Sequence, residues 1–421
     1  MAPETYAPLT PETIPARLGG LPALRALIGP DPATWRAVEV GDGNLNLVFI
    51  VSGPSGKAVA KQALPYVRLV GESWPLPLER AWFEWNALTR EAARAPGSVP
   101  TVHHFDREQA LLVMEFLDDH VILRKSLIAG VEHPGLASFL GLFCARTLFR
   151  STDLSLPTAE KKADVALFAG NVALMDITEA LVFTDPYRDA PMNRHTPGLE
   201  ALVAELRADE ALKVEAQHLK WAYTANAEAL LHGDLHTGSI MAVGDRISVI
   251  DPEFASYGPI GFDVGMLIAN FLMAYHAQSG HEAAPGERDG YREWILGVAE
   301  GIWTTFVAEF ARLWREERRG ILYPAALYED QGQPAAAERA LADRLGAIWV
   351  DALGFCGVEI HRRILGLAHN ADFETIAYEA RRAACEAPAL RLGRALVHGR
   401  RTIGSMADVC ALARAEDAAG R

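Results

Sequence analysis

Two short hydrophobic, β-rich runs stand out near the start of the chain. Residues 46–51 and 58–63 are rich in valine, leucine, isoleucine, alanine and phenylalanine, and a turn with two glycines and a proline separates them at 52–56. Short apolar runs on either side of such a turn predict a β-hairpin.

Other elements predicted around this hairpin complete a small mixed unit. A helical pattern covers residues 10–27 and stops at Gly29-Pro30, a second covers 77–95, and 109–115 predicts another strand. Several strands with one intervening helix describe a small α+β lobe, which we place at residues 1–117.

The pattern changes after residue 117. Long helical patterns cover 136–150 and 199–231, and the apolar run 264–275 predicts a buried helix too short for the ~20 residues that cross a bilayer. One compact β-rich segment, 239–251, interrupts them, and exposed loops are expected at 283–287 and 331–336. The remainder, 118–421, is therefore predicted to be a large helical lobe.

Charge narrows the range of partners. The 40 Lys and Arg residues stand against 54 Asp and Glu residues, a net charge of −14. Such a balance disfavours nucleic acid or an anionic membrane surface as the main partner, while a few local cations would suffice for a small anion.

The spacing of the cysteines and the composition of the first ten residues indicate in which cellular compartment the protein is expected. The four cysteines are scattered and form no C-x-x-C pair, which favours reduced thiols over a zinc site or a disulfide framework. Residues 1–10 have neither a basic start nor an apolar core, so no signal peptide is expected. A cytoplasmic location is the simplest prediction.

The strongest chemical signal is a pair of acidic loops. His232-Gly233-Asp234 precedes the β-rich segment and Asp251-Pro252-Glu253 follows it, so the hairpin should fold the second loop back beside the first. Phosphoryl transfer needs one carboxylate to orient the acceptor hydroxyl, here Asp234, and others to hold Mg²⁺. Asp251 and Glu253, expected along one extended face, are the candidate metal ligands. The alternative is that these acids are ordinary turn residues.

Three further motifs each have two interpretations. Gly41-Asp42-Gly43-Asn44 could bring backbone N–H groups close to phosphate oxygens, or be only a hairpin turn. Lys61, on a strand predicted to be buried, should pair with an acid on the next helix, for which we choose Glu84 over Glu79; alternatively it reaches solvent from an edge strand. Asp263 could cap the apolar helix or anchor the catalytic loop.

The last motif is the adjacent pair Arg362-Arg363 in an apolar helical stretch. Neighbouring helical positions diverge by about 100°, so one arginine should point toward the buried side. From the pattern alone, a solvated or salt-bridged face is the simpler interpretation.

Long blocks of the chain resemble the 5-methylthioribose kinases, which have a protein-kinase-like two-lobed α+β fold. The resemblance runs from about residue 39 to 369, in the same order. The blocks that carry it are residues 41–49, 61–66, 71–76, 232–240, 251–255, 257–263 and 362–369.

This resemblance implies an activity. ATP, with Mg²⁺, would phosphorylate the anomeric 1-hydroxyl of 5-methylthioribose in methionine salvage, and the enzyme would be a homodimer. Asp234 would be the base, Arg362 and Arg363 would reach the substrate and the phosphoryl group, and Trp74 would close near the sugar. Ser239 stands where related kinases carry a metal-binding Asn, so Glu253 could replace that ligand.

The nucleotide would be held mainly by the small lobe. Asn44 would also face the sugar. The residues implied in nucleotide binding are Gly41, Asp42, Gly43, Asn44, Lys61, Glu84 and the hinge Met114, Glu115 and Phe116.

Two other functions fit the same motifs. One is a kinase for another pentose or an aminoglycoside, although Arg362-Arg363 is ill suited to a cationic acceptor. The other is a non-catalytic nucleotide-binding protein. The intact set of catalytic and metal-ligand candidates disfavours it, namely Lys61, Glu84, Asp234, Asp251 and Glu253.

Overall fold

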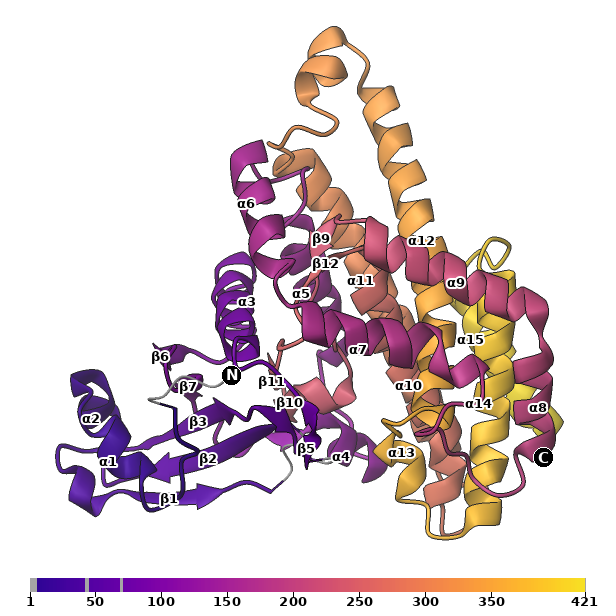
Figure 1. Cartoon of the computed structure of the whole chain (residues 1–421). Helices are drawn as coiled ribbons and strands as arrows, with labels where there is room; N and C mark the ends of the chain where they lie inside the picture. Colours follow the sequence, from indigo (N-terminus) through magenta and orange to yellow (C-terminus); the bar gives the residue numbers. More distant parts are fainter. Residues whose placement is uncertain (1–5, 42–44, 69–70, 421) are drawn as a thin grey trace.

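The computed structural model describes residues 6–41, 45–68 and 71–420 of the chain. A small region of antiparallel strands lies to one side of a much larger helical region, drawn in indigo and in magenta to yellow in Figure 1. The α+β class predicted from the sequence is confirmed. The boundary predicted between residues 117 and 118 falls in the segment just after β7, which ends at Glu115.

The small lobe is built on a five-stranded sheet in the order β1-β2-β3-β7-β6, with a separate β4-β5 pair beside it. The predicted hairpin is β2 and β3, in which Val48 lies opposite Lys61. The strands are β1 Arg36–Glu39, β2 Asn46–Ser52, β3 Lys57–Ala63, β4 Tyr66–Val67, β5 Gly71–Pro75, β6 Val102–Asp106 and β7 Leu111–Glu115.

Helices cover this sheet. The helix predicted over 10–27 is wrong as one element: Gly19 and Gly20 divide it into α1 (Ile14–Leu18) and α2 (Pro22–Ile28). Glycine lowers helix stability, and the break lets both short helices place leucines and isoleucines against the sheet. The helix predicted over 77–95 is α3, Arg80–Arg94.

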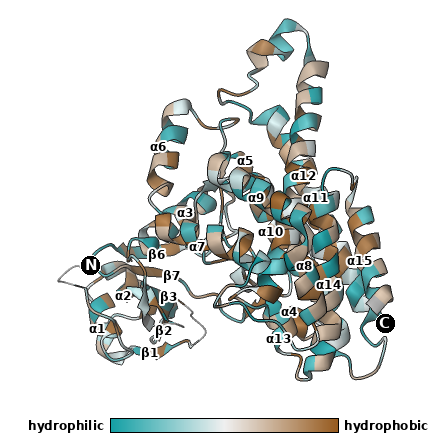
Figure 2. Ribbon diagram, turned by 45° about the vertical axis from the view of Figure 1, so that its right-hand side comes forward, coloured by the Kyte–Doolittle hydropathy of each residue, from teal (hydrophilic) through white to brown (hydrophobic). Residues whose placement is uncertain are grey.

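The large lobe is mostly helical, as predicted. Hydrophobic and hydrophilic stretches alternate along most of its helices in Figure 2, as expected for helices with one buried face. Its helices are α4 Leu123–Ile128, α5 Leu136–Phe149, α6 Thr158–Phe168, α7 Val172–Phe183, α8 Glu200–Ala208, α9 Glu210–Ala225, α10 Gly261–His281, α11 Asp289–Glu316, α12 Pro334–Leu365, α13 Ala371–Glu374, α14 Glu379–Gly399 and α15 Met406–Gly420.

Two predictions in this lobe need correction. The helix expected over 199–231 is interrupted at Asp209, whose side chain accepts a hydrogen bond from Leu212 N and caps α9, and α9 ends at Ala225. The loop expected over 331–336 is cut short because Pro334 begins α12, in the first-turn position that suits proline.

The β-rich segment predicted at 239–251 is a hairpin of β10 (Ile240–Val243) and β11 (Arg246–Val249). β8 (Val121–Ile122) pairs with β10, which attaches the hairpin to the beginning of the helical lobe. β9 (Ala229–Leu230) and β12 (Tyr257–Gly258) pair on either side of it, so the two acidic loops leave one small β-region.

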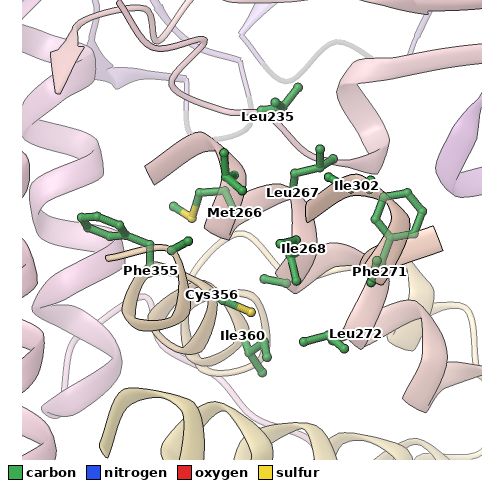
Figure 3. Packing of buried hydrophobic residues seen from close by; sticks show 14 of the residues in the cluster. Leu235, Met266, Leu267, Ile268, Phe271, Leu272, Ile302, Phe355, Cys356 and Ile360 are labelled. Atoms are coloured by element: carbon green, nitrogen blue, oxygen red, sulfur yellow. The ribbon is translucent and has the colours of Figure 1, made fainter. Parts of the chain in front are cut away.

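The buried helix α10 organises the core beneath these loops. It contacts α11, α12 and α14, and a Cβ atom on Gly265 would lie 2.4 Å from the Ala352 carbonyl of α12, so glycine permits this close approach. Figure 3 shows Leu235, next to the candidate base, beside Leu267 of α10, while Cys356 and Ile360 of α12 lie on the side of Ile268 of α10. The same core thus supports the loop at Asp234 and the arginine-bearing end of α12.

Among the described residues, no single helix is long and apolar enough to cross a membrane. Only α6 and the segment after it, taken together, have the length and composition of a membrane span, and the two are bent by 75° relative to each other.

Candidate active site

The backbone of the loop at Asp234 is held by a buried carboxylate from α10. Asp263 Oδ2 accepts from His232 N at 2.6 Å, and Oδ1 accepts from Gly233 N at 3.1 Å. Burial raises the pKa of Asp263 to about 7, although these backbone hydrogen bonds lower it. The anchoring interpretation of Asp263 is therefore confirmed, and the capping interpretation is wrong, because α10 has no side-chain cap.

Gly233 shapes the same loop. Its φ angle is +85°, and a Cβ atom there would lie 2.2 Å from the carbonyl oxygen of Phe254. Only glycine combines that left-handed backbone with so close a contact. The two acidic loops therefore touch through their backbones, as the intervening hairpin predicted.

Three side chains surround the carboxylate of Asp234. Arg363 Nη2 donates to Oδ1 at 2.9 Å, Arg362 Nη1 lies 3.5 Å from Oδ1, and His236 Nε2 lies 3.2 Å from Oδ2. His236 Nδ1 accepts from Gly238 N at 2.9 Å, which leaves the ring proton on Nε2, facing Asp234. Asp234 is therefore oriented through both oxygens.

These neighbours set the protonation of Asp234. Burial alone would raise its pKa, but His236, Arg363 and Arg362 together hold it well below its usual range. Burial also lowers the pKa of His236 to about 4, so the imidazole is neutral at pH 7 and the arginines are the cationic partners. Asp234 is consequently ionised throughout the neutral range.

Both arginines are buried and share a second carboxylate. Arg362 and Arg363 are 8% and 5% exposed, so they do not lie on a solvated face, whereas the salt-bridged alternative is confirmed by their ion pairs with Glu359 and Asp234. Glu359, 1% exposed, accepts from Arg363 Nε at 2.6 Å and from Arg362 Nη1 at 3.1 Å. The divergence expected between adjacent positions is overcome because long guanidinium side chains bend toward the same pair of carboxylates.

Lys61 stands on the opposite lobe in a second charge cluster. Its Nζ donates to Glu84 Oε1 at 2.9 Å and also contacts Asp251 Oδ1. Burial would lower the pKa of Lys61, but Asp251, Glu84 and Glu253 raise it above its usual value. The predicted pairing with Glu84 is confirmed, and the alternative of an exposed edge-strand lysine is wrong, since Lys61 is buried.

Glu253 reaches this cluster from a buried position. Asn46 Nδ2 donates to Glu253 Oε2 at 2.9 Å, and Arg80 Nε lies 3.7 Å from the same oxygen. Arg80 also donates to the Leu45 carbonyl at 2.7 Å, at the edge of the glycine-rich segment. These contacts join the two lobes at Glu253.

Three carboxylates could accept a divalent cation together. Ligand oxygens of Glu84, Asp251 and Glu253 lie within 4.8 Å of one another, and oxygen donors of this kind suit Mg²⁺. Asp251 and Glu253 do not share the extended face that we expected, because Asp251 has a left-handed φ of +71°. Such a backbone is uncommon outside glycine and is typical of functional sites.

The remaining predicted residues lie around these clusters. Trp74 on β5 and Phe254, which follows Glu253, pack against one small apolar group of Val67, Leu76 and Leu174. Ser239 Oγ donates to the Asp234 carbonyl at 2.9 Å, a contact within the loop itself. Gly41 is exposed, whereas Asp42, Gly43 and Asn44 lie outside the described residues.

The predicted hinge comprises the last two residues of β7, Met114 and Glu115, and the residue after it, Phe116. Met114 is buried, Glu115 accepts from Thr101 N at 3.0 Å, and Lys57 Nζ lies 4.8 Å from the centre of the Phe116 ring. Glu115 also borders a cavity of about 790 Å³ between α3, β6 and α5. Lys61, Asp234 and Asp251 do not line that cavity, so it lies apart from both charge clusters.

Sequence reasoning missed four members of the site, namely His236, Glu359, Arg80 and Asn46. Glu359 could have been found, because it lies three and four positions before the arginines, the spacing at which helical side chains meet. His236 lies in the same loop as Asp234, only two positions after it. Arg80 and Asn46 approach Glu253 only through the tertiary fold.

Comparisons with known proteins agree with this geometry. Residues 36–297 match the phosphotransferase enzyme family (APH). Methylthioribose kinase 1 of Oryza sativa subsp. japonica is 42% identical over 408 residues, covering 96% of this chain and 94% of that protein. The methylthioribose kinase of Escherichia coli O45:K1 (strain S88 / ExPEC) is 42% identical and covers 97% of each chain.

Among solved structures, a glucosamine kinase in complex with glucosamine, ADP and inorganic phosphate is 17% identical, with a TM-score of 0.49, and covers 92% of this chain and 86% of that chain. That similarity is too distant to add to the assignment. The family match and the near full-length relatives decide it: the chain belongs to the phosphotransferase enzyme family and, within it, to the methylthioribose kinases.

Proposed function

We propose that this protein is an ATP-dependent kinase that phosphorylates the anomeric 1-hydroxyl of methylthioribose, giving the 1-phosphate in methionine salvage. The observation that carries the proposal is the placement of Asp234 beside Arg362 and Arg363. A carboxylate that orients a hydroxyl, next to cations facing developing charge, is what phosphoryl transfer requires. The relatives named above supply the acceptor.

Asp234 would act on the acceptor hydroxyl. The sugar oxygen forms a bond to the γ-phosphorus while the bond from that phosphorus to the bridging oxygen breaks, and ADP leaves with the electron pair. The hydroxyl proton passes to the Asp234 carboxylate, which is ionised at neutral pH. Arg363 and His236 hold that carboxylate in position, so its main contribution is orientation.

Lys61 and the acidic cluster would serve the nucleotide. Lys61 would contact the α- and β-phosphates while Glu84 holds its ammonium group in place. The carboxylates of Asp251 and Glu253 fit a magnesium ion, and Asn46 and Arg80 fix Glu253 for that purpose. When bound, magnesium supplies neutralisation of the phosphate charge. Gly41 to Asn44 and the hinge Met114, Glu115 and Phe116 would bind the rest of the nucleotide.

In this proposal, Trp74 and Asn44 contact the sugar, and the two lobes are residues 1–117 and 118–421. The enzyme is also proposed to be a homodimer in the cytoplasm. The packing of Trp74 and Phe254 against one apolar group favours a place for Trp74 near the cleft. The acidic net charge of −14 and four free cysteines fit an enzyme of a reducing compartment. Size-exclusion chromatography with light scattering tests the dimer.

A coupled ADP-release assay tests the activity. Methylthioribose, ribose, other pentoses and an aminoglycoside are offered at equal concentration, with the Asp234→Asn protein as a blank. We expect kcat/KM for methylthioribose of about 10⁴ M⁻¹s⁻¹ or more, with the product identified as an anomeric phosphate by ³¹P NMR. Faster turnover of another alcohol, or ATP binding with no turnover of any acceptor, would overturn the proposal.

A further inference from the structure

Glu359 is almost completely buried at the site, and each of its carboxylate oxygens accepts a hydrogen bond from a different arginine. Oε1 accepts from Arg363 Nε at 2.6 Å, and Oε2 accepts from Arg362 Nη1 at 3.1 Å. Burial alone would raise the pKa of Glu359, but Arg363 and Arg362 lower it, so the carboxylate is ionised. Together with Asp234 it balances the two guanidinium charges.

The two arginines are not held equally. Arg363 bridges two carboxylates, with Nε on Glu359 at 2.6 Å and Nη2 on Asp234 at 2.9 Å. Arg362 reaches both through Nη1 alone, at 3.1 and 3.5 Å. Its buried Nε has no hydrogen-bond partner within the part of the chain that the structure describes. Arg363 is therefore fixed, whereas Arg362 is loosely held and has a donor to satisfy.

We propose that Glu359 is a positioning residue that separates the tasks of the two arginines. It clamps Arg363 as the permanent partner of Asp234 and leaves Arg362 to turn toward the transferred phosphoryl group. Without the Glu359 charge, Arg363 would lose one of its two anchors and would no longer hold Asp234 in place. This inference rests on the proposed kinase function.

Double-mutant cycles on kcat test it. Glu359→Gln keeps the size of the side chain and one acceptor but removes the charge; it is made in the wild-type, Arg363→Gln and Arg362→Gln backgrounds. We expect it to lower kcat roughly 10- to 100-fold in the wild type and at least about 10-fold in Arg362→Gln, but less than about 3-fold in Arg363→Gln. KM for ATP should change by less than about 2-fold, because the Lys61 cluster is untouched.

Two further variants separate positioning from folding. Glu386→Gln removes another carboxyl from a residue only 1% exposed, on α14 and outside the site, and should keep kcat. Glu359→Asp keeps the charge on a shorter side chain and should recover part of the kcat lost in Glu359→Gln. This variant keeps the inference testable even when Glu359→Gln folds poorly. Thermal unfolding is recorded for each protein.

Several outcomes would overturn the inference. The first is that Glu359→Gln lowers kcat as strongly in the Arg363→Gln background as in the wild type. The second is that Glu359→Gln no longer lowers kcat in the Arg362→Gln background. The third is that Glu359→Gln alone lowers kcat no more than Glu386→Gln does. The cycles are measured with whichever acceptor the wild type uses, or on basal ADP release. A wild type that does not phosphorylate methylthioribose refutes the proposed function, whereas an additive Glu359–Arg363 cycle in an active enzyme refutes only the positioning by Glu359.

Discussion

Arg363 and Asp234 are 129 positions apart in the chain and are joined by a 2.9 Å hydrogen bond. The bond connects the last turn of α12 to the loop that follows β9. Asp263 of α10 holds the backbone of the same loop, and α10 packs closely on α12. The candidate base is therefore fixed twice, once through its backbone and once through its side chain, by two helices that share one core.

Asp234→Asn should lose at least about 10²-fold in kcat, because the amide can neither take the proton nor keep its charge pairing with Arg363. The dissociation constant for ATP, measured by calorimetry, should stay within about 2-fold, since the Lys61 cluster is on the other lobe. Asp245→Asn, at the exposed turn of the β10–β11 hairpin, is the matched control and should keep full activity. Near-normal turnover of Asp234→Asn would show that another group is the base.

Removing either proposed metal ligand should raise the Mg²⁺ concentration that gives half-maximal activity. Asp251→Ala and Glu253→Ala each delete one oxygen ligand from the cluster, so roughly 10-fold shifts are expected for each. Glu79→Ala, an exposed acid just before α3, should leave the titration unchanged. Unchanged titrations for both Asp251 and Glu253 variants would show that magnesium is held elsewhere.

Lys61→Met should weaken ATP binding or turnover severely, because it removes the phosphate contact and leaves Glu84 buried without its cation. Lys61 and Glu84 form a 2.9 Å ion pair, so we expect a coupling free energy of at least about 1 kcal/mol in a double-mutant cycle on kcat/KM. A coupling near zero would mean that Asp251, the other partner of Lys61, carries the interaction instead.

Local pattern was sufficient for much of the fold. The β2–β3 hairpin follows from two short apolar runs around a turn, and the buried α10 follows from a long apolar run interrupted by Asn270. Even the Lys61–Glu84 pair was predictable, since a buried lysine needs an acid and the next helix offers few. Each of these inferences uses residues that are close in the chain or a strong physical requirement.

What the sequence did not reveal depends on tertiary contacts or on small local free energies. Asn46 meets Glu253 across 207 positions, and no local pattern marks that contact. The left-handed φ of Asp251 has no sequence marker, because aspartate adopts it more readily than most residues but in only a minority of cases. The break at Asp209 depends on one capping side chain, an effect of about 1 kcal/mol that periodicity alone does not register.

Glu386→Gln should become more stable relative to the wild type as pH rises. Burial raises the pKa of Glu386 from 4.5 to about 7. A carboxyl with a raised pKa in the folded state contributes stability that is complete below its unfolded pKa and is lost as pH rises through the folded pKa. Between about pH 4.5 and 7 the wild type should thus lose on the order of 2–3 kcal/mol that the variant keeps.

Urea unfolding at pH 5, 6, 7 and 8 measures this difference in the free energy of unfolding. The difference between Glu386→Gln and the wild type should grow through pH 7 and then level off. A difference that does not vary with pH would mean that Glu386 ionises in the folded protein as it does in the unfolded chain.

Replacing either active-site arginine by lysine should already impair the enzyme. Arg363 contacts Glu359 through Nε and Asp234 through Nη2 at the same time, and the single ammonium group of lysine cannot reproduce that planar bridge. We expect Arg363→Lys and Arg362→Lys each to lose at least about 10-fold in kcat. KM for ATP should change little, because charge on the phosphoryl group develops only during transfer.

The competing interpretation is that the arginines only stabilise the fold. Measurements of kcat and of thermal stability on the same variants distinguish the two interpretations. A structural loss would lower the melting temperature and the amount of folded protein but leave kcat per folded molecule unchanged. Arg315→Lys provides the comparison, because Arg315 makes a bidentate pair with Glu338 on the surface between α11 and α12, where kcat should not respond. If both active-site lysine variants kept full kcat and lost only thermal stability, the buried pair would be a structural feature of α12, and charge stabilisation would have to come from the Lys61 cluster alone.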